Sequence, residues 1–441
     1  MHIRRARVLF AAASLGFVAT MAAGQDNEVK VIAYNVHASI SAVGQVLGVS
    51  LICELQKANT ASHIDFLFDS DAQVQSIQSR TEQEWSDLPF TFAGKDTVRL
   101  TLPVRLRSAT TLAVRFIYKL PNAILNDTLL ALDRGNRWYP LMVDQIASMK
   151  LTAEVPARYT VLSAGNLMES VTSDGRARFV WQCVAPVFKL PLIIFRSDVF
   201  TKSVQDCAGK TVVLYSFRND TLGVKRILAE AGNAFMFYKE YVGEYPYAGL
   251  TLVEVPHFEG INVGSGLLTV GSRSLDEMNE GYFDGLHLTI AQQWMGAGVF
   301  ARFGKPGFWF LSLSFAHYLR LMYVRHARGE EAFNEALRGP LKKYPEFAGK
   351  DNDIPIIGVD FPNSKEKGLL LYAKGPFVIS KLHKQMGEES WRTFLQYLYR
   401  NFAGKILTYD EFRSSLSKHD ASGRTLLLLN RLMTQKGIPE E

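Results

Sequence analysis

Four residues in the second half of the sequence are of the types that bind metal ions or transfer protons. His257 and Glu259 lie in the stretch PHFEGINVG (256–264), and His287 and His317 lie in apolar segments farther along. Imidazole nitrogens and carboxylate oxygens are the usual protein ligands of Zn²⁺. A histidine beside an apolar face is more often a hydrogen-bonded structural residue than a ligand. We therefore favour structural roles, and keep a metal site built from these four residues as the alternative.

A serine between two glycines offers a different chemistry. Ser265, in VGSGLL (263–268), lies in a glycine-rich stretch that suggests a nucleophile turn. Such a turn in a hydrolase has the spacing Gly-x-Ser-x-Gly and is served by a paired histidine and acid. The local sequence lacks that spacing, and no such pair stands at a recognisable place. We do not expect a serine hydrolase.

The second half of the chain, from about residue 222, is expected to be mainly helical. Apolar residues recur at i, i+3, i+4 and i+7, the period of a helix with one buried face, in the segments 223–243, 283–303 and 390–402. Between the first two of these helices, 248–271 is typical of a strand, a glycine-rich stretch and a second strand. The candidate ligands therefore come from helices and from the loop that precedes them.

The first half alternates apolar and polar residues, which is the pattern of strands with one buried face. Two long examples span residues 98–121 and 148–171, bounded by turn-forming Pro, Gly, Asn and Asp residues. We expect a β-rich, mostly antiparallel domain at 25–205 and a mainly helical domain at 206–441. The predicted fold class is therefore α+β.

Residues 1–24 are typical of a secretory signal peptide. A basic start is followed by an apolar run from Val8 to Ala23 and by small residues near Gly24. The run is shorter than the ~20 residues that a membrane-spanning helix needs, so an uncleaved anchor is the less favoured alternative. No later segment is long and apolar enough to span a bilayer. We expect export to the periplasm or the medium, without a transmembrane segment once the signal is removed.

Charge and composition narrow the range of partners. The chain of 441 residues carries a formal charge of +6, and three leader arginines, Arg4, Arg5 and Arg7, account for half of it. The remaining charge is too small to indicate nucleic-acid binding. A hydrophobic content of 47% is that of a globular protein with a large core.

The cysteines do not form an even set. Cys53, Cys183 and Cys207 allow at most one disulfide, and Cys183 with Cys207 is the pair nearer in sequence. Free cysteines are often buried as small apolar residues. We favour three buried thiols over one disulfide.

Five segments, taken in order, resemble the M1 family of zinc aminopeptidases (gluzincins). They carry an Arg-Trp-Tyr-Pro block, a Tyr-Pro-Tyr before a strand, a Gln-Trp-x-Gly helix, a Phe-Ala pair and a Tyr-x-Lys-Gly helix start, in family order and approximate spacing. The segments are 137–167, 237–271, 288–296, 311–319 and 371–398. The resemblance implies an N-terminal β saddle domain followed by a thermolysin-like, mainly helical domain.

The zinc helix of that family reads His-Glu-x-x-His-Gln-Trp. Its two histidines bind Zn²⁺ one turn apart, and its glutamate takes a proton from the water that the metal activates. The stretch LTIAQQWMG matches this helix at Gln293 and Trp294. The resemblance then puts Leu288 and Gln292 at the histidine positions and Thr289 at the position of the general base. Both imidazoles and the base are replaced.

The other functional positions of the family change as well, with one exception. Matching Phe315 and Ala316 puts Leu313 at the third ligand, and the glutamate that binds a peptide's α-amino group becomes Val263. Tyr372, in YAKG, matches the tyrosine that helps to stabilise the tetrahedral oxyanion, although we favour a packing role for it here. Hydrocarbon side chains have no lone pair for a metal, so we expect no cofactor.

Neighbouring histidines do not simply restore the ligands. His287 lies about 100° around the helix from Leu288, so the two side chains point in different directions. His317 lies one turn beyond Leu313 and is the better placed of the two.

We expect an exported, catalytically inactive relative of the M1 aminopeptidases. The cleft implied by the resemblance suits extended chains, so the expected partner is a peptide or another exported protein. The alternative is a divergent zinc aminopeptidase that uses the displaced histidine and glutamate ligands. The residues expected to line the groove are His257, Glu259, Gly260, Val263, Gln292 and Gln293.

Overall fold

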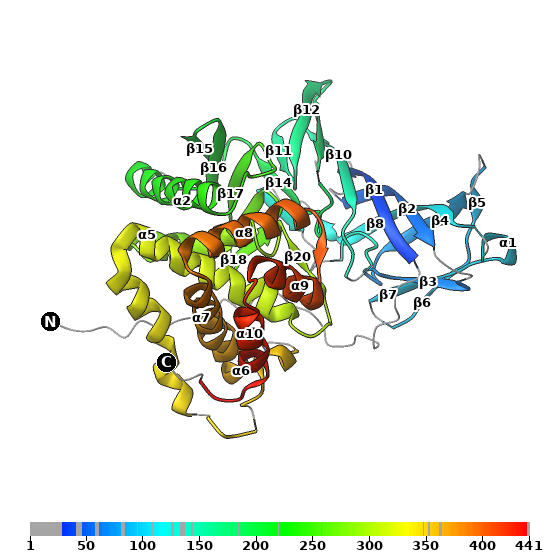
Figure 1. Ribbon diagram of the computed structural model, residues 1–441. Helices are drawn as coiled ribbons and strands as arrows, with labels where there is room; N and C mark the ends of the chain where they lie inside the picture. Colours follow the sequence, from blue (N-terminus) through cyan, green and yellow to red (C-terminus); the bar gives the residue numbers. More distant parts are fainter. Residues whose placement is uncertain are drawn as a thin grey trace.

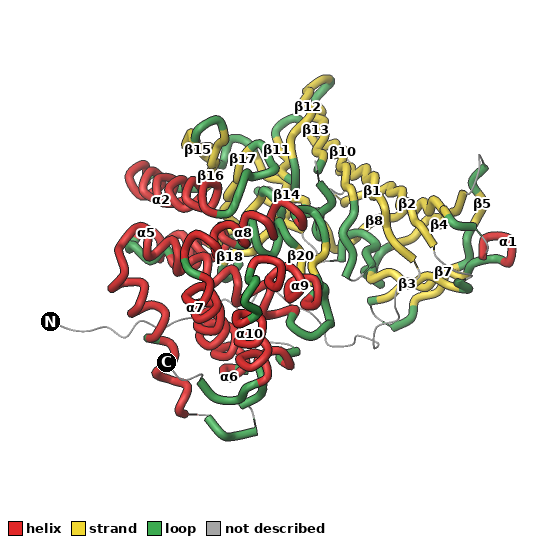
Figure 2. Tube along the Cα trace, in the orientation of Figure 1, coloured by secondary structure: helices red, strands yellow, loops and turns green. Residues whose placement is uncertain are grey.

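The computed structural model describes residues 29–438 with several gaps, so the signal-peptide prediction for 1–24 lies outside the described residues. Strands fill the first part of the described chain and helices most of the second (Figure 1, Figure 2). The predicted α+β class is confirmed. Among the described residues, no helix combines the length and apolar character that crossing a bilayer requires. The gaps are 41–45, 58–60, 81–83, 95, 108, 125–127, 133–136, 143, 184, 219, 257, 347, 352 and 361–363.

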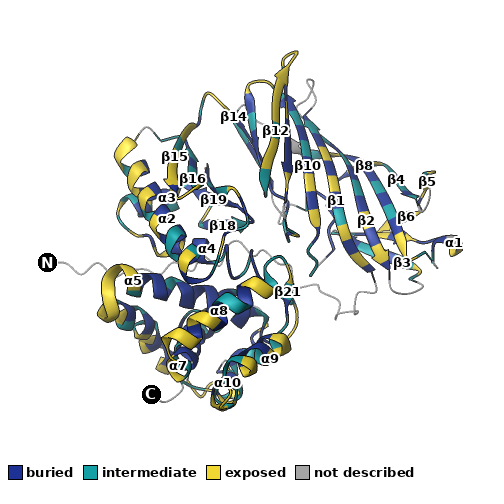
Figure 3. Ribbon diagram, turned by 45° about the horizontal axis from the view of Figure 1, so that its top comes forward, coloured by how far each residue is buried: buried dark blue, intermediate teal, exposed yellow. Residues whose placement is uncertain are grey.

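The first part of the chain is built on an eight-stranded sheet of order β12-β13-β10-β1-β2-β8-β4-β5. Paired strands are antiparallel except β1 and β10, which run parallel. Burial alternates along the strands, as the banded ribbon of Figure 3 shows, because successive side chains point to opposite faces. The strands are β1 Val29–Ile40, β2 Val46–Lys57, β4 Gln73–Arg80, β5 Ser86–Asp87, β8 Thr111–Ile124, β10 Ser148–Pro156, β12 Asn166–Ser173 and β13 Arg176–Gln182.

Two three-stranded sheets, of order β3-β7-β6 and β11-β14-β9, accompany the large sheet. The first packs on β8 through aromatic rings, with the centroids of Phe66 and Phe116 5.5 Å apart and those of Phe68 and Tyr118 4.8 Å apart. The short helix α1 follows β7. The bounds are β3 His63–Leu67, β6 Phe90–Phe92, β7 Thr97–Thr101, α1 Val104–Arg107, β9 Leu129–Leu132, β11 Tyr159–Leu162 and β14 Leu192–Arg196.

A five-stranded sheet of order β15-β16-β17-β19-β18 joins the strand-rich part to the helices. Because β15 pairs with β16 over its whole length, the chain changes sheets between β14 and β15. The predicted domain boundary between residues 205 and 206 falls inside β15. The glycine-rich stretch contributes a strand of its own, β18, where two strands with a loop between them were expected. The strands are β15 Thr201–Cys207, β16 Lys210–Ser216, β17 Gly249–Val255, β18 Ile261–Gly264 and β19 Leu267–Gly271.

The helical part packs α2, α4, α5 and the C-terminal helices around one apolar interior (Figure 1). Asp220 caps α2, because its carboxylate accepts hydrogen bonds from the backbone of Leu222 and Gly223. Strands β20 and β21 form a separate two-stranded parallel sheet. The helices and this pair are α2 Thr221–Tyr241, α3 Ser272–Asn279, α4 Asp284–Ala291, β20 Phe300–Ala301, η2 Phe310–Ser314, α5 Phe315–Arg338, η3 Pro340–Glu346, η4 Ile356–Gly358, α6 Lys365–Leu369, η5 Leu370–Lys374, α7 Gly375–Met386, α8 Glu388–Phe402, β21 Ile406–Leu407, α9 Tyr409–His419 and α10 Arg424–Thr434.

The helix predicted at 283–303 is shorter than its periodicity indicates. It ends at Ala291, and the chain then turns through residues with no helical continuation. Gly296 has φ of +134°, which a side-chain-bearing residue rarely adopts, and a Cβ at Gly298 would lie 2.5 Å from the carbonyl oxygen of Gln293. Two glycines therefore end the helix although the apolar spacing continues beyond them.

All three cysteines are buried and free, so the predicted thiols are confirmed and Cys183 does not pair with Cys207. Burial raises the pKa of the Cys183 thiol to about 12. The thiols therefore act as packing groups and are poor nucleophiles.

Candidate functional site

The helix α4 carries the positions that the M1 resemblance assigns to two metal ligands and the general base. Leu288 is half-buried, Gln292 caps the helix, and Thr289 is buried. The Thr289 hydroxyl donates to the carbonyl oxygens of Gly285 and Leu286, both at 3.0 Å. A hydroxyl engaged in this way stays on its own helix backbone and has no basicity with which to take a proton from water.

The Gln293 side chain is buried and engaged in hydrogen bonds inside the protein. Only 1% of it is exposed. Its Oε1 accepts from the Tyr245 hydroxyl at 2.8 Å and from the Gly266 amide at 3.0 Å, and its Nε2 donates to the Gly264 carbonyl at 2.9 Å. We predicted that Gln293 lines the degenerate groove; the structure buries it as a link between α4 and the β18–β19 turn.

Two short π-helical turns carry the other positions that the resemblance singles out. Leu313 lies in η2 and Tyr372 lies in η5, and π turns are rare and are often found at functional sites. The Ser314 hydroxyl joins the turns by donating to the Leu371 carbonyl at 2.8 Å. A Cβ at Gly375 would lie 2.0 Å from the Ser314 Oγ, so this contact requires glycine.

The end of α4 lies against η2. A Cβ added to Gly296 would lie 3.6 Å from the Gln292 Cβ and 3.6 Å from the Ser312 carbonyl oxygen. The backbone of Gly296 therefore lies in the narrow space between the Gln292 side chain and the Ser312 carbonyl group. Leu313 itself is only 6% exposed. The turn at Gly296 thus brings Gln292 near the backbone of η2, the element that also carries Leu313.

His317 packs against Tyr372 across the two π turns. The ring centroids lie 4.4 Å apart with the planes at 86°. Neither ring nitrogen of His317 has a hydrogen-bond partner among the described residues. Burial lowers the pKa of this imidazole well below its ordinary value, and the charge of Arg320 acts in the same direction, so the ring is neutral. Burial also raises the pKa of the Tyr372 hydroxyl.

The His287 side chain points toward α2. Its Nε2 lies 3.0 Å from a carboxylate oxygen of Glu230 on α2, and its ring meets that of Tyr323 edge to face at 4.6 Å. Glu259 is exposed, and His257 lies outside the described residues. Across the described parts of 29–438, no group of three or more His, Cys, Asp or Glu side chains is arranged to bind a metal ion. The alternative metal site is not assembled from its described members.

The loop that would bind a peptide's α-amino group has changed its chemistry. Val263 lies half-buried on β18, beside a gap of about 10 Å³, which is the size of one water molecule. The buried Asn262 accepts from the Lys189 ammonium at 3.0 Å. Lys189 also lines the gap beside Val263. Gly260, with φ of +84°, closes the loop by accepting from the Gly271 amide at 2.9 Å.

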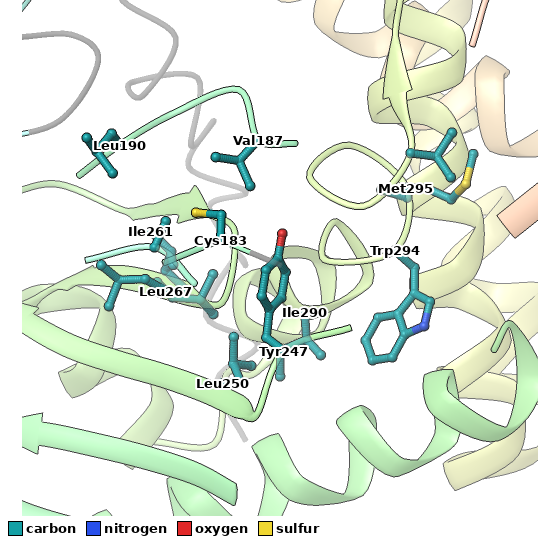
Figure 4. Packing of buried hydrophobic residues seen from close by; sticks show 14 of the residues in the cluster. Cys183, Val187, Leu190, Tyr247, Leu250, Ile261, Leu267, Ile290, Trp294 and Met295 are labelled. Carbon is teal, nitrogen blue, oxygen red and sulfur yellow. The ribbon is translucent and has the colours of Figure 1, made fainter. Parts of the chain in front are cut away.

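An apolar layer from both halves of the chain surrounds this region (Figure 4). Trp294 is fully buried and donates its indole N–H to the Gly243 carbonyl at 2.8 Å. Figure 4 shows the buried cluster, which combines residues from the strand-rich part with residues from the five-stranded sheet and the chain around α4. Its labelled members are Cys183, Val187, Leu190, Tyr247, Leu250, Ile261, Leu267, Ile290, Trp294 and Met295.

The donor atoms at the positions singled out do not fit a zinc ion. Zn²⁺ needs thiolate, imidazole or carboxylate ligands. Leu288 and Leu313 offer hydrocarbon and Gln292 offers a neutral amide. We therefore derive no catalytic step through a metal here.

The comparisons with known proteins identify the fold. No family model and no curated protein matches the sequence. Among solved structures, a two-domain M1 zinc metallopeptidase mutant bound to L-arginine superposes with a TM-score of 0.72 at 16% identity, covering 94% of this chain and 96% of that one. An M1 zinc metallopeptidase from Deinococcus radiodurans superposes with a TM-score of 0.71 at 17% identity, covering 95% and 97%. The chain has the fold of the two-domain M1 zinc metallopeptidases.

Proposed function

We propose that this protein is an exported, catalytically inactive counterpart of the M1 zinc metallopeptidases that binds peptides or exported proteins in its groove. The observation that carries the proposal is the donor set of Leu288, Gln292 and Leu313, which has replaced every metal-binding group. Without a metal, a buried glutamine or leucine cannot lower the pKa of water. The groove then has a surface for binding and no group for hydrolysis.

The state of Thr289 supports the loss of catalysis. A peptidase of this type needs a carboxylate to take the proton from the attacking water. The Thr289 hydroxyl donates to backbone carbonyl oxygens of its own helix and is neutral at physiological pH. Neither half of the water-activating pair is present at the predicted positions.

The edge of the five-stranded sheet supports a peptide-binding role. β18 is the outermost strand of that sheet. Extended peptides bind many proteins by adding a strand to such an edge, where backbone hydrogen bonds supply affinity without sequence specificity. Glu259 and Gly260 directly precede this strand, and Val263 lies on it.

The Lys189 ammonium makes a specific prediction about the peptides. An aminopeptidase holds the free α-amino group of its substrate with a carboxylate, whereas Val263 with nearby Lys189 provides no anion and one cation. Acetylating the N-terminus of a peptide should therefore leave its affinity unchanged or increase it. Fluorescence anisotropy of C-terminally labelled tripeptides, free and acetylated, measures this. A requirement for the free amine would contradict the proposal.

Turnover assays test the loss of catalysis. We expect no cleavage of amino-acid anilides by the wild-type protein with added Zn²⁺. The matched control is a variant that restores the family's groups, with Leu288→His, Thr289→Glu, Gln292→His and Leu313→Glu. Chelator-sensitive cleavage by the wild-type protein would favour the alternative, a divergent aminopeptidase with displaced ligands, for which the unpartnered ring nitrogens of His317 are the one supporting observation.

Export is tested separately. The apolar run after Arg4, Arg5 and Arg7 is the basis of this part of the proposal. Fractionation of expressing cells, with N-terminal sequencing of the mature protein, should place the protein outside the cytoplasm with a new terminus near residue 25. A cytoplasmic protein that begins at Met1 would contradict it.

A further inference from the structure

A cavity of about 660 Å³ lies between α2 and α5, closed at one side by the turn that precedes α4. Helices α2 and α5 lie one above the other at the left of Figure 1. None of the described residues predicted to line the peptide groove borders this cavity. Its volume falls within the range of about 300 to 1,000 Å³ that is usual for small-molecule sites.

Glu230, on α2, presents a carboxylate to this cavity. One of its oxygens, Oε1, lies 3.0 Å from the His287 Nε2 and accepts from the Tyr323 hydroxyl at 3.3 Å. The hydrogen bond with His287 is the largest cause that lowers the pKa of this carboxyl, so the group is ionised. The second oxygen, Oε2, has no hydrogen bond to any described residue. The carboxylate is therefore oriented by the protein and keeps one oxygen for a ligand.

Arg226, one helical turn before Glu230, is held in place by different neighbours. Its Nη1 donates to the Asn279 carbonyl at 3.2 Å, and its guanidinium lies 5.5 Å from the centroid of the Phe283 ring. Gly281 has φ of +97°, and a Cβ there would lie 2.8 Å from the Arg226 Nη2. Because Gly281 has no side chain, it leaves room for the Arg226 guanidinium.

Opposite charges at i and i+4 on a helix can pair, since their Cβ atoms lie about 6 Å apart, and the pair is stronger when the acidic residue comes first. Arg226 and Glu230 form no ion pair within 4.0 Å, although both are described residues that line the same cavity. Each is kept from the other by its own partners. The cavity therefore offers a cation and an anion that are not paired with each other, and such charges can bind the carboxylate and the ammonium group of an α-amino acid.

Aromatic rings form the wall beside the two charges. The centroid of Phe237 lies 5.6 Å from that of Tyr323 and 5.0 Å from that of His326. Phe283 adds a fourth ring at the Arg226 side. Such a wall favours an apolar side chain, and its ring faces also attract an ammonium group.

We propose that the cavity between α2 and α5 binds a free α-amino acid with a large apolar side chain. Its carboxylate contacts Arg226, its ammonium contacts the Glu230 Oε2, and its side chain lies against Phe237 and Tyr323. Arg328, which also lines the cavity, is close enough to Glu230 to help lower the pKa of that carboxyl. This ligand site is independent of the peptide groove and of the function proposed for it.

Isothermal titration calorimetry on the full-length protein tests the ligand class without any mutation. We expect saturable binding of L-phenylalanine, and binding at least about tenfold weaker for N-acetyl-L-phenylalanine, which lacks the ammonium, and for L-phenylalaninamide, which lacks the carboxylate. Equal affinity for the three compounds, or no saturable binding of L-phenylalanine at millimolar concentrations, would overturn the proposal.

Substitutions at the cavity test whether the amino acid binds there. Glu230→Gln and Arg226→Gln should each weaken L-phenylalanine binding at least about tenfold, because each removes one charge-assisted hydrogen bond. Lys225→Gln and Glu335→Gln are matched controls, since they make the same charge changes at exposed positions that do not line the cavity. Undiminished binding in both cavity variants would place the amino acid elsewhere and contradict the proposal.

Discussion

The two sides of α4 differ in the polar side chains that they carry. On one side, the helix carries Leu288 and its cap Gln292, the positions that the M1 resemblance assigns to zinc ligands. Toward α2, it presents His287, which is fixed to an ionised carboxylate. A buried polar group is retained at little cost only where it has a partner. The first side therefore carries a hydrocarbon and a neutral amide, and the second carries an imidazole hydrogen-bonded to an ionised carboxylate.

The contact between the two π turns should show the largest effect. Gly375→Ala places a Cβ 2.0 Å from the Ser314 Oγ and 2.4 Å from its Cβ, inside a well-packed interior. We expect the free energy of unfolding to fall by about 3 kcal/mol, in the upper part of the range for overpacking. Urea denaturation measures this change. The double variant Gly375→Ala, Ser314→Gly should recover part of the loss, and full additivity of the two changes would contradict a direct contact.

The hydrogen bonds of Gln293 should give the next largest effect. Gln293→Leu removes three hydrogen bonds and leaves the Tyr245 hydroxyl and the Gly266 amide buried without their acceptor. We expect a loss of about 2 kcal/mol in the free energy of unfolding. Gln292→Leu, at the half-buried neighbour, is the control and should cost less. Equal losses in the two variants would show that the Gln293 side chain contributes no more to the free energy of unfolding than that of Gln292.

The neutral imidazole of His317 should contribute a pH-dependent term. Because its pKa is lowered in the folded state, the unfolded chain binds more protons below about pH 6.5, and stability falls as the pH drops through that value. His317→Phe should therefore flatten the decline in unfolding free energy below pH 6.5 and change it at pH 7 by less than about 1 kcal/mol, since the ring nitrogens have no described partners. An unchanged pH profile would show that His317 is already protonated or exposed.

On the other side of α4, the smallest effect concerns one carboxyl group. His287→Leu removes the hydrogen bond that most lowers the pKa of Glu230, so this pKa should rise toward its ordinary value. NMR titration of the Glu230 side-chain carboxyl measures the shift. Tyr323→Phe, which removes the weaker of the two donors, should raise the pKa less. A larger rise in Tyr323→Phe would reverse the assignment of which neighbour orients the carboxylate.

The sequence predicts the classes of element well because their signals are local. Alternation predicts the strands and the helical period predicts α2 and α8, whose observed bounds differ from the predicted segments 223–243 and 390–402 by about two residues. The helix at 283–303 is too long in the prediction because apolar residues continue after Ala291. Gly296 and Gly298 end it through backbone conformation and close approach, which hydrophobic spacing does not report.

The contacts that define the two sites are not local. Lys189 reaches Asn262 from 73 residues away, and the π turns depend on Ser314 meeting the chain at Leu371. Arg226 and Glu230 have the spacing of a helical ion pair, and the sequence alone would join them. Only tertiary neighbours keep the two charges apart, so the cavity between α2 and α5 has no signature in the chain itself.

The metal content of the native protein tests the central claim most directly. The protein is purified without chelator, incubated with Zn²⁺, passed through a desalting column and measured by plasma mass spectrometry. Since Leu288, Gln292 and Leu313 supply no imidazole, thiolate or carboxylate, the expected result is far less than one zinc per chain. About one zinc per chain that is lost from the Gln292→Leu variant, which removes the amide donor, and not from a surface control such as Lys225→Gln, would contradict the account.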